Sequence, residues 1–265
     1  MAITVVVNGA LGRMGKEVAS ALSKDPDLKP VGAADTRADS DTLSLPDRSG
    51  SIPLSASLET ILQETEPQVV VDFSIAEAVM PAVRLASSYK ASMVIGTTGL
   101  SSENLEEIDR LMRENERGAV VAPNFALGAV LMIHLAKMAA RFFDYAEIIE
   151  LHHEQKVDAP SGTALATAQS MVAARGKPFL YSKASKESIS GTRGGELQGV
   201  AIHSARLPGL MAHQEVILGT SGQTLTIRHD TINRECYMPG VVLAIKKVVE
   251  VKGLIFGLEK VMGLQ

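Results

Sequence analysis

Cysteine is almost absent from this chain of 265 residues, which contains only Cys236. A single thiol excludes an intramolecular disulfide and any zinc site built from several cysteines. No apolar run approaches the ~20 residues that cross a bilayer, and the N-terminal segment lacks the basic start and cleavage site of a signal peptide. We therefore expect a cytoplasmic chain without a membrane partner.

Positive charge is also scarce. The 26 lysines and arginines are outnumbered by 30 acidic residues, for a net charge of −4, which argues against a nucleic-acid partner. An anionic ligand must then meet a local cluster of positive groups. No repeat or low-complexity tract is present, and hydrophobic residues make up an ordinary 46%. The length predicts a globular protein of roughly two domains.

Strand-like and helix-like segments alternate through the first half of the chain. Strands are expected at 3–7, 31–34, 68–73, 92–95 and 119–122, helices at 16–23, 58–65, 76–89 and 103–116, and a loop over 35–56. The strands are continuous apolar runs, typical of strands buried on both faces. This alternation predicts an α/β, doubly wound and mostly parallel sheet.

The pattern changes after residue 124. A helix is expected over 127–142, a strand over 147–152, a helix over 163–175, half-exposed strands between about 183 and 235, and a final helix within 240–262. We therefore expect an inserted α+β domain with an open mixed sheet at 124–234. Residues 1–123 and 235–265 would form the doubly wound domain around the insertion.

The first strand is followed directly by a glycine-rich segment and then by a helix. The segment reads Gly9-Ala10-Leu11-Gly12-Arg13-Met14-Gly15. Glycine permits positive φ and close approach to a pyrophosphate, and a helix start supplies aligned amides. The spacing departs from GxGxxG, so an ordinary tight turn stays the alternative. In this context the segment predicts a Rossmann-type domain that binds a dinucleotide.

Other cofactor candidates follow the later strands. Asp35 comes after the second strand, where a carboxylate binds the adenosine ribose, whereas Arg37 suits a 2′-phosphate, so both NADH and NADPH stay open. Two further loops at strand ends suit a nicotinamide, although the residues of each can also be explained as those that an ordinary turn requires. Their residues are Gly96, Thr97 and Thr98, and Ala122, Pro123, Asn124 and Phe125.

The densest chemistry lies between residues 150 and 163. His152, His153 and Lys156 are proton donors of different strength, and Ser161-Gly162-Thr163 opens a helix whose amides suit a carboxylate. The alternatives are structural histidines with a solvated lysine, or a metal site. Adjacent residues of a strand diverge and no HExxH pattern is present, so we expect no metal. Roles for Arg234 and the glycine loop 191–195 stay open.

Five segments carry a resemblance to a known family. They read GALGRMG at 9–15, VDFS at 71–74, VIGTTG at 94–99, APNF at 122–125 and IIELHHEQKVDAPSGTAL at 148–165. The chain resembles 4-hydroxy-tetrahydrodipicolinate reductases, also called dihydrodipicolinate reductases, of the diaminopimelate route to lysine. The resemblance implies reduction of a small dicarboxylate, 4-hydroxy-tetrahydrodipicolinate, to tetrahydrodipicolinate by hydride from NADH or NADPH.

The resemblance also implies roles for individual residues. His152 would be the general acid–base residue and Lys156 its partner proton donor, with His153, Gly162 and Thr163 as substrate contacts. Residues 9–14 would hold the pyrophosphate, and 96–98 with 122–125 the nicotinamide. A homotetramer built through the open sheets, and a catalytic domain that closes over the ligands, are further implications. The family's usual acidic position at the adenosine end aligns nearer to Thr36 than to Asp35, so the cofactor preference stays open.

Two other functions are alternatives for this sequence. Another two-domain dehydrogenase, acting on aspartate or homoserine, would share the glycine loop but has no reason for the 152–163 segment. A dinucleotide sensor without catalysis would be expected to lose the proton donors His152 and Lys156, and this chain has both.

Overall fold

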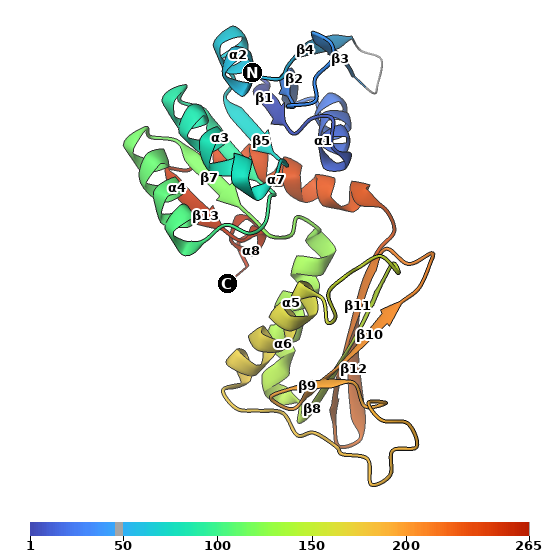
Figure 1. The fold of residues 1–265 in the computed structure, drawn as a ribbon. Helices are drawn as coiled ribbons and strands as arrows, with labels where there is room; N and C mark the ends of the chain where they lie inside the picture. Colours follow the sequence, from blue (N-terminus) through green and yellow to red (C-terminus); the bar gives the residue numbers. More distant parts are fainter. Residues whose placement is uncertain (46–49, 265) are drawn as a thin grey trace. The chain divides into compact units, whose positions relative to one another are not determined.

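The computed structural model describes residues 1–45 and 50–264, which fold into two compact units (Figure 1). The first unit comprises Met1–Leu127 and Arg234–Gln265, and the second comprises Gly128–Asn233. The second unit is therefore an insertion into the first. Among the described residues, no helix is both long and apolar enough to span a membrane.

A mostly parallel sheet of eight strands forms the centre of the first unit, in the order β13-β7-β6-β5-β1-β2-β4-β3. Its strands are β1 (Ile3–Asn8), β2 (Leu28–Ala34), β3 (Thr42–Ser44), β4 (Ser51–Ser55), β5 (Val69–Asp72), β6 (Ser92–Ile95), β7 (Gly118–Val121) and β13 (Gly253–Phe256). Only the β3–β4 pair is antiparallel. The predicted doubly wound parallel sheet is confirmed.

Helices cover both faces of this sheet (Figure 1). They are α1 (Arg13–Lys24), α2 (Leu58–Thr65), α3 (Ala76–Ser88), α4 (Ser102–Glu114), α7 (Met238–Val248) and the short α8 (Leu258–Val261). Helix α3 packs between α2 and α4, whereas α1 packs against α7. The central strands are fully buried, as the valine runs 5–7 and 69–71 show. Burial on both faces explains why their sequences are continuously apolar.

The second unit contains a five-stranded mixed sheet in the order β12-β11-β8-β10-β9. Its strands are β8 (Tyr145–His152), β9 (Gly195–Leu197), β10 (Val200–Arg206), β11 (Ala212–Thr220) and β12 (Gln223–Thr231). Strands β8 and β10 run parallel, and the other pairs are antiparallel. The predicted open mixed sheet is confirmed.

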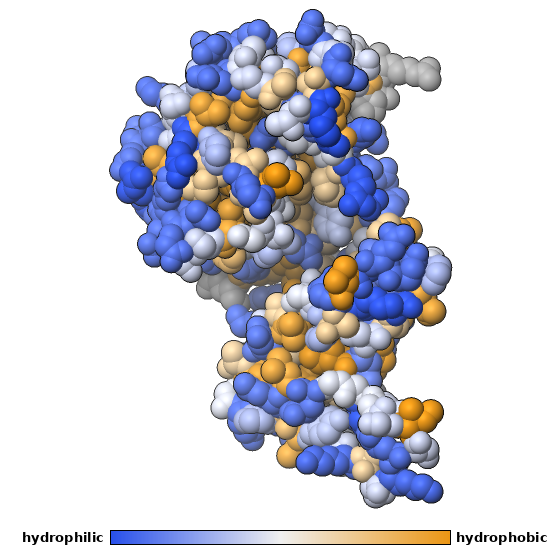
Figure 2. All heavy atoms as spheres, viewed as in Figure 1, coloured by the Kyte–Doolittle hydropathy of each residue, from blue (hydrophilic) through white to orange (hydrophobic). Residues whose placement is uncertain are grey.

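Helices α5 (Leu127–Ala139) and α6 (Gly162–Arg175) supply the core of the second unit. Met132 of α5 and Met171 of α6 pack with Ile148 and Leu218 of the sheet. Helix α5 also exposes apolar side chains, and Figure 2 shows hydrophobic residues gathered over α5 and α6. The exposed apolar side chains of α5 are Leu131, Leu135 and Met138.

The helix expected within 240–262 is confirmed only in its first part and is wrong for the residues that follow. Helix α7 ends at Val248, and residues 253–256 form strand β13 beside β7. Gly253 and Gly257 adopt positive φ, and the carboxylate of Asp109 accepts the Leu254 amide at 2.8 Å. Two glycine bends and a strand partner thus override an apolar pattern that periodicity alone assigns to a helix.

Two smaller differences concern loops and helix ends. The loop expected over 35–56 contains strands β3 and β4, while residues 46–49 lie outside the described part of the chain. The helix expected over 127–142 ends at Ala139 and continues as a 3-10 turn, Ala140–Phe142.

Candidate active site

The glycine-rich segment forms the turn between β1 and α1. Gly9 has a φ of +77°, and a Cβ there would lie 2.8 Å from the carbonyl oxygen of Phe73. A Cβ at Gly15 would lie 2.2 Å from the carbonyl oxygen of Gly9, so only glycine lets α1 approach the turn this closely. Gly12 is the N-cap of α1 and offers no capping side chain. A phosphate fits such a helix start, so the residues present suit a dinucleotide.

This turn lies where the strand order reverses. Strand β1 has β2 on one side and β5 on the other, and the turns after β1 and β5 meet at Gly9 and Phe73. In open α/β sheets, ligands bind beyond the carboxyl ends of the strands at such a switch point. Ala10, Leu11, Arg13 and Met14 lie on the same turn or the first turn of α1.

Asp35 and Arg37 form an ion pair beside the glycine turn. The guanidinium donates from Nε and Nη2 to the two carboxylate oxygens, both at 3.0 Å, and the Leu11 amide donates to Oδ2 at 3.0 Å. Arg37 holds the pKa of Asp35 below its ordinary value, against the effect of burial. The Asp35 side chain is 5% exposed and that of Arg37 is 65% exposed. The accessible group at this position is therefore the cation.

One of the two loops expected at the nicotinamide end, residues 96–98, is tied to a buried carboxylate, Asp72 at the end of β5. Asp72 accepts the Asn8 side-chain amide at 2.6 Å, the Ser74 amide and hydroxyl, and the Thr97 hydroxyl at 3.1 Å. It thereby links the ends of β1, β5 and β6 with neutral donors alone. Asp72 was missed as a site residue, although a carboxylate that ends a buried valine run was a usable signal.

Aromatic packing joins the same two loops. A Cβ at Gly96 would lie 2.0 Å from the ring of Phe73, which packs at 5.8 Å from the ring of Phe125. The Ala122 amide donates to the Ile95 carbonyl, and the side-chain oxygen of Asn124 accepts the Ala126 amide. Thr98 is exposed, and Pro123 follows in the second loop. The structure thus brings residues 96–98 and 122–125 together at one edge.

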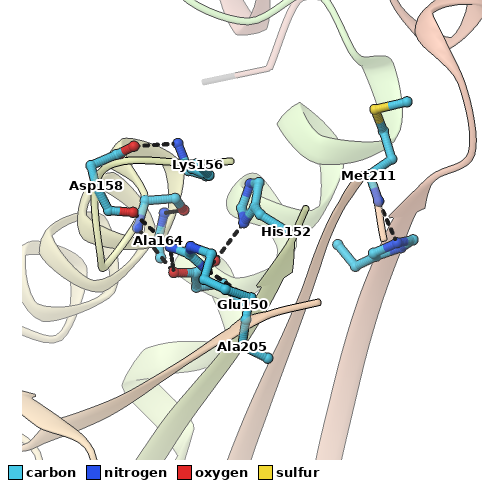
Figure 3. Close-up of polar contacts among 10 residues, drawn as sticks. Glu150, His152, Lys156, Asp158, Ala164, Ala205 and Met211 are labelled. Carbon is cyan, nitrogen blue, oxygen red and sulfur yellow. Dashed lines mark hydrogen bonds and ion pairs between the residues drawn. The ribbon is translucent and has the colours of Figure 1, made fainter. Parts of the chain in front are cut away.

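In the second unit, His152 is paired with a fully buried carboxylate (Figure 3). Its Nδ1 lies 2.5 Å from Oε2 of Glu150, two residues earlier on β8. Burial lowers the pKa of His152, and the nearby Lys156 and Arg206 lower it further, against the opposing effect of Glu150. The neutral ring, with its proton on Nδ1, then directs Nε2 away from Glu150.

Glu150 itself is held by donors from three elements. Arg206 of β10 donates to both carboxylate oxygens, at 2.8 and 2.9 Å, and the Ser161 amide at the start of α6 donates to Oε1 at 3.2 Å. Burial alone would raise the pKa of Glu150, but hydrogen bonds from Arg206, Ser204 and His152 outweigh it, so the pKa is lowered. The carboxylate therefore stays ionised inside the unit.

Lys156 lies in the segment that connects β8 to α6. Its Nζ donates to Oδ1 of Asp158 at 2.6 Å, as Figure 3 shows, and its amide donates to the His153 carbonyl at 3.2 Å. Asp158 has a lowered pKa, first because of the Lys156 hydrogen bond and also through the Gly162 amide. A carboxylate of the protein thus already contacts both an ammonium group and the start of α6.

Ser161 has a different position from its neighbours Gly162 and Thr163. It is buried, its hydroxyl caps α6 by accepting the Ala164 amide at 3.2 Å, and its own amide is taken by Glu150. Its polar groups are therefore used inside the protein. Gly162 is exposed and Thr163 partly exposed at the first turn of α6.

Sequence reasoning missed two residues of this cluster, Glu150 and Arg206. Glu150 had a usable signal, because a charge two residues before His152 on a strand shares its face. Arg206 had no such signal in the sequence. It lies beside His152 only because of the register in which β10 pairs with β8. Among the described residues, no group of three potential ligands is placed to hold a metal ion.

Two features were left undecided by the sequence. Arg234 begins a 3-10 turn, Arg234–Tyr237, in the first unit. The glycine loop 191–195 is tied to β8, because Arg193 donates to Glu147 at 2.5 Å. Gly191, Gly194 and Gly195 of this loop line a pocket together with Ala159, Pro160 and Leu165, next to the start of α6.

Comparison with known proteins covers the whole chain. Residues 3–125 match the family model for the N-terminus of dihydrodipicolinate reductase, and residues 128–262 match the model for its C-terminus. A 4-hydroxy-tetrahydrodipicolinate reductase of Dehalococcoides mccartyi is 58% identical over 99% of both chains. One from Moorella thermoacetica is 50% identical over 98% of both chains.

Solved structures agree with this match. A dipicolinate-bound dihydrodipicolinate reductase from Paenisporosarcina sp. TG-14 has a TM-score of 0.88 at 39% identity and covers 98% of this chain and 99% of its own. An amine dehydrogenase from Mycobacterium smegmatis has a TM-score of 0.66 at 17% identity, covering 96% of this chain and 94% of its own. The second likeness concerns the fold alone.

The ionised state of Glu150 predicts a pH-dependent stability. Its folded-state pKa is lowered, so it stabilises the fold above its unfolded pKa of about 4.3, and this contribution is lost as the pH falls through the folded value. We expect Glu150→Gln to lose about 1–3 kcal/mol at pH 7, because a buried guanidinium loses its charged acceptor. The loss should shrink below about pH 4, as measured by urea unfolding at both pH values.

Glu107→Gln is the matched control, since Arg84 also binds Glu107 through two nitrogens, but at the surface. We expect a smaller loss there. An equal loss in both variants, or a Glu150→Gln loss that persists in acid, would contradict the assignment.

Proposed function

The chain belongs to the dihydrodipicolinate reductase family, and from this premise we propose that it reduces 4-hydroxy-tetrahydrodipicolinate to tetrahydrodipicolinate in lysine biosynthesis. It is an oxidoreductase. The observation that carries the proposal is the buried Glu150 carboxylate, which binds His152 and the first residues of α6 at once. A proton-transfer group is thereby held next to a helix start suited to an anion. Its place in the cytoplasm stays a prediction from the sequence.

The first unit is proposed to hold the nicotinamide cofactor, which supplies the hydride when bound. The glycine turn and the start of α1 would hold the pyrophosphate, since glycines there leave the amides accessible. Residues 96–98 and 122–125, joined through the ring of Phe73, would hold the nicotinamide end. Asp35 and Arg37 would face the adenosine ribose.

The second unit is proposed to bind the two carboxylates of the substrate. Gly162 and Thr163 at the start of α6, together with His153, are the expected contacts, and the dipicolinate bound to the Paenisporosarcina reductase is a dicarboxylate as well. Lys156 already binds a carboxylate, that of Asp158. Ser161 would act indirectly, by capping α6 and donating to Glu150.

The overall reaction adds one hydride and one proton to the substrate and releases one water. His152 receives or gives the proton at Nε2, because Nδ1 is held by Glu150. Its pKa is lowered by burial first, so it is neutral before substrate binds. Two arriving carboxylates would raise the pKa of His152 and favour its protonated form. Lys156 would donate a proton to the departing hydroxyl while one proton leaves the neighbouring ring carbon, so that loss of water consumes no net proton.

Arg37 is proposed to let the enzyme accept NADPH as well as NADH. The Asp35 carboxylate is occupied by Arg37 and the Leu11 amide, whereas the guanidinium is mostly exposed. A 2′-phosphate would therefore meet a cation, and a ribose hydroxyl would still find Asp35 nearby.

We also propose a homotetramer assembled through the sheet face turned away from α5 and α6. On β11, buried and partly exposed residues alternate, and Ile217 lies on the partly exposed face with Glu147 and His213. A sheet with one face outside the core is suited to cover the same face of another copy.

Removal of both proposed proton donors should lower the turnover rate far more than the affinity for the cofactor. We expect His152→Ala/Lys156→Ala to lower kcat by about 10²–10⁴-fold, with the Kd for the cofactor within about twofold of wild type. Turnover is followed by cofactor oxidation with 4-hydroxy-tetrahydrodipicolinate, and Kd by calorimetry. The control His134→Ala/Lys137→Ala changes the same residue types on α5 and should keep kcat. Wild-type turnover in the first variant would refute these roles.

Cofactor choice can be measured without turnover. We expect Arg37→Gln to raise the Kd for NADPH about tenfold, since a charge-assisted hydrogen bond contributes about 1.5–3 kcal/mol, and to change the Kd for NADH little. Arg13→Gln should weaken both cofactors alike, because the pyrophosphate is common to them. Equal effects of Arg37→Gln on NADH and NADPH would exclude the proposed contact.

The assembly proposal predicts different effects from the two faces of the second unit. Ile217→Arg should dissociate the tetramer in sedimentation velocity, because it places a charge at the centre of the proposed interface. Leu135→Arg, on exposed α5, should leave the tetramer intact. If Leu135→Arg dissociates the tetramer and Ile217→Arg does not, the interface lies on the helical face and the proposal is wrong. A monomeric wild-type protein would also contradict it.

A further inference from the structure

Arg206 joins two parts of the candidate active site. It ends β10, paired in register with His152, the last residue of β8. Its Nη1 and Nη2 donate to Glu150, and Nη2 also donates to the backbone carbonyl of Asp158 at 2.6 Å. One guanidinium therefore binds the carboxylate that orients His152 and the segment that carries Lys156.

The contacts of Arg206 require the planar, forked guanidinium group. Its Nε is buried and has no hydrogen-bond partner among the described residues, although such a group is costly to bury. The fold accepts this cost while both Nη atoms stay on their acceptors. A lysine would carry the same charge, but its ammonium group lacks the planar fork that spans the two carboxylate oxygens.

We propose that Arg206 is a positioning residue for the reaction, which holds the Glu150 carboxylate against Nδ1 of His152 and fixes the connection between β8 and α6 that carries Lys156. Its effect on turnover rests on the proposed function. Its effect on His152 does not, because the ion pair exists without substrate.

The charges around His152 give this role a measurable sign. Glu150 on β8 favours protonated His152, whereas Arg206 on β10 and Lys156 on the connecting segment disfavour it. Asp158 is engaged by Lys156, which keeps its charge paired. Loss of the Arg206 cation alone should therefore raise the pKa of His152, whereas movement of the Glu150 carboxylate away from Nδ1 should lower it. A variant that keeps the charge at position 206 separates the two effects.

The first experiment titrates His152 by NMR in protein with ¹³C-labelled histidine, with the signal assigned by its loss in His152→Gln. We expect the midpoint of His152 to fall in Arg206→Lys, which keeps the charge but lacks the fork that holds Glu150 against Nδ1, and to lie higher in Arg206→Met, which also loses the charge. A wild-type midpoint in Arg206→Lys would overturn the proposal.

The second experiment measures turnover. We expect Arg206→Met and Arg206→Lys both to lower kcat, by about 10²-fold in Arg206→Met, since small misplacements of reacting groups have effects of this size. The Kd for the cofactor should not change. Should Arg206→Met fail to fold, Arg206→Lys decides the matter: wild-type kcat in Arg206→Lys refutes positioning.

Arg175→Met is the matched control. Arg175 also bridges a carboxylate and backbone carbonyls, those of Asp144, Phe143 and Pro178, next to the start of β8 rather than its end. It should keep both kcat and the His152 midpoint, and equal effects at Arg175 would reduce Arg206 to a stabilising residue. If wild type itself shows no turnover, the proposed function fails while the NMR titration still tests Arg206.

Discussion

The second unit depends on keeping one charged carboxylate, that of Glu150, inside its core. A buried charge is costly unless it is paired and hydrogen-bonded, and here the donors come from β8, β10 and the start of α6. Each donor thereby acquires a fixed place relative to the others. The same carboxylate that constrains packing also fixes which nitrogen of His152 is left for chemistry. Structural and chemical requirements coincide at this group.

The first unit meets a similar requirement with neutral donors. Asp72 is fully buried and receives hydrogen bonds from Asn8, Ser74 and Thr97, at the ends of three adjacent strands. The loop 96–98, proposed for the nicotinamide, is therefore connected to the ends of β1 and β5 through one side chain. Steric limits complete the arrangement, because a Cβ at Gly9, Gly15 or Gly96 would overlap neighbouring atoms. Both units thus use a buried carboxylate at strand ends to organise nearby loops.

Prediction from sequence succeeded where structure is decided locally. The strand 92–95 and the helix 58–65 were predicted to the residue, because an apolar run and a capped amphipathic segment suffice to define them. It failed for β13, whose strand conformation depends on pairing with β7 and on the bond from Asp109 to Leu254. It failed likewise for β3 and β4, which are short strands in a polar segment at the edge of the sheet. In these cases partners distant in the chain outweighed local preference.

The class of fold, the glycine turn and the set of chemical groups between residues 150 and 163 can be predicted from the chain alone, because each of these is recorded in neighbouring residues. The long motifs identify the family as well. How those groups are used follows instead from three-dimensional packing: Ser161 caps a helix and binds Glu150, Arg37 neutralises Asp35, and Arg206 reaches Glu150. The reason is strand register. Which residue of β10 lies beside which residue of β8 is set by the packing of the whole sheet, and no local period in the sequence carries that information.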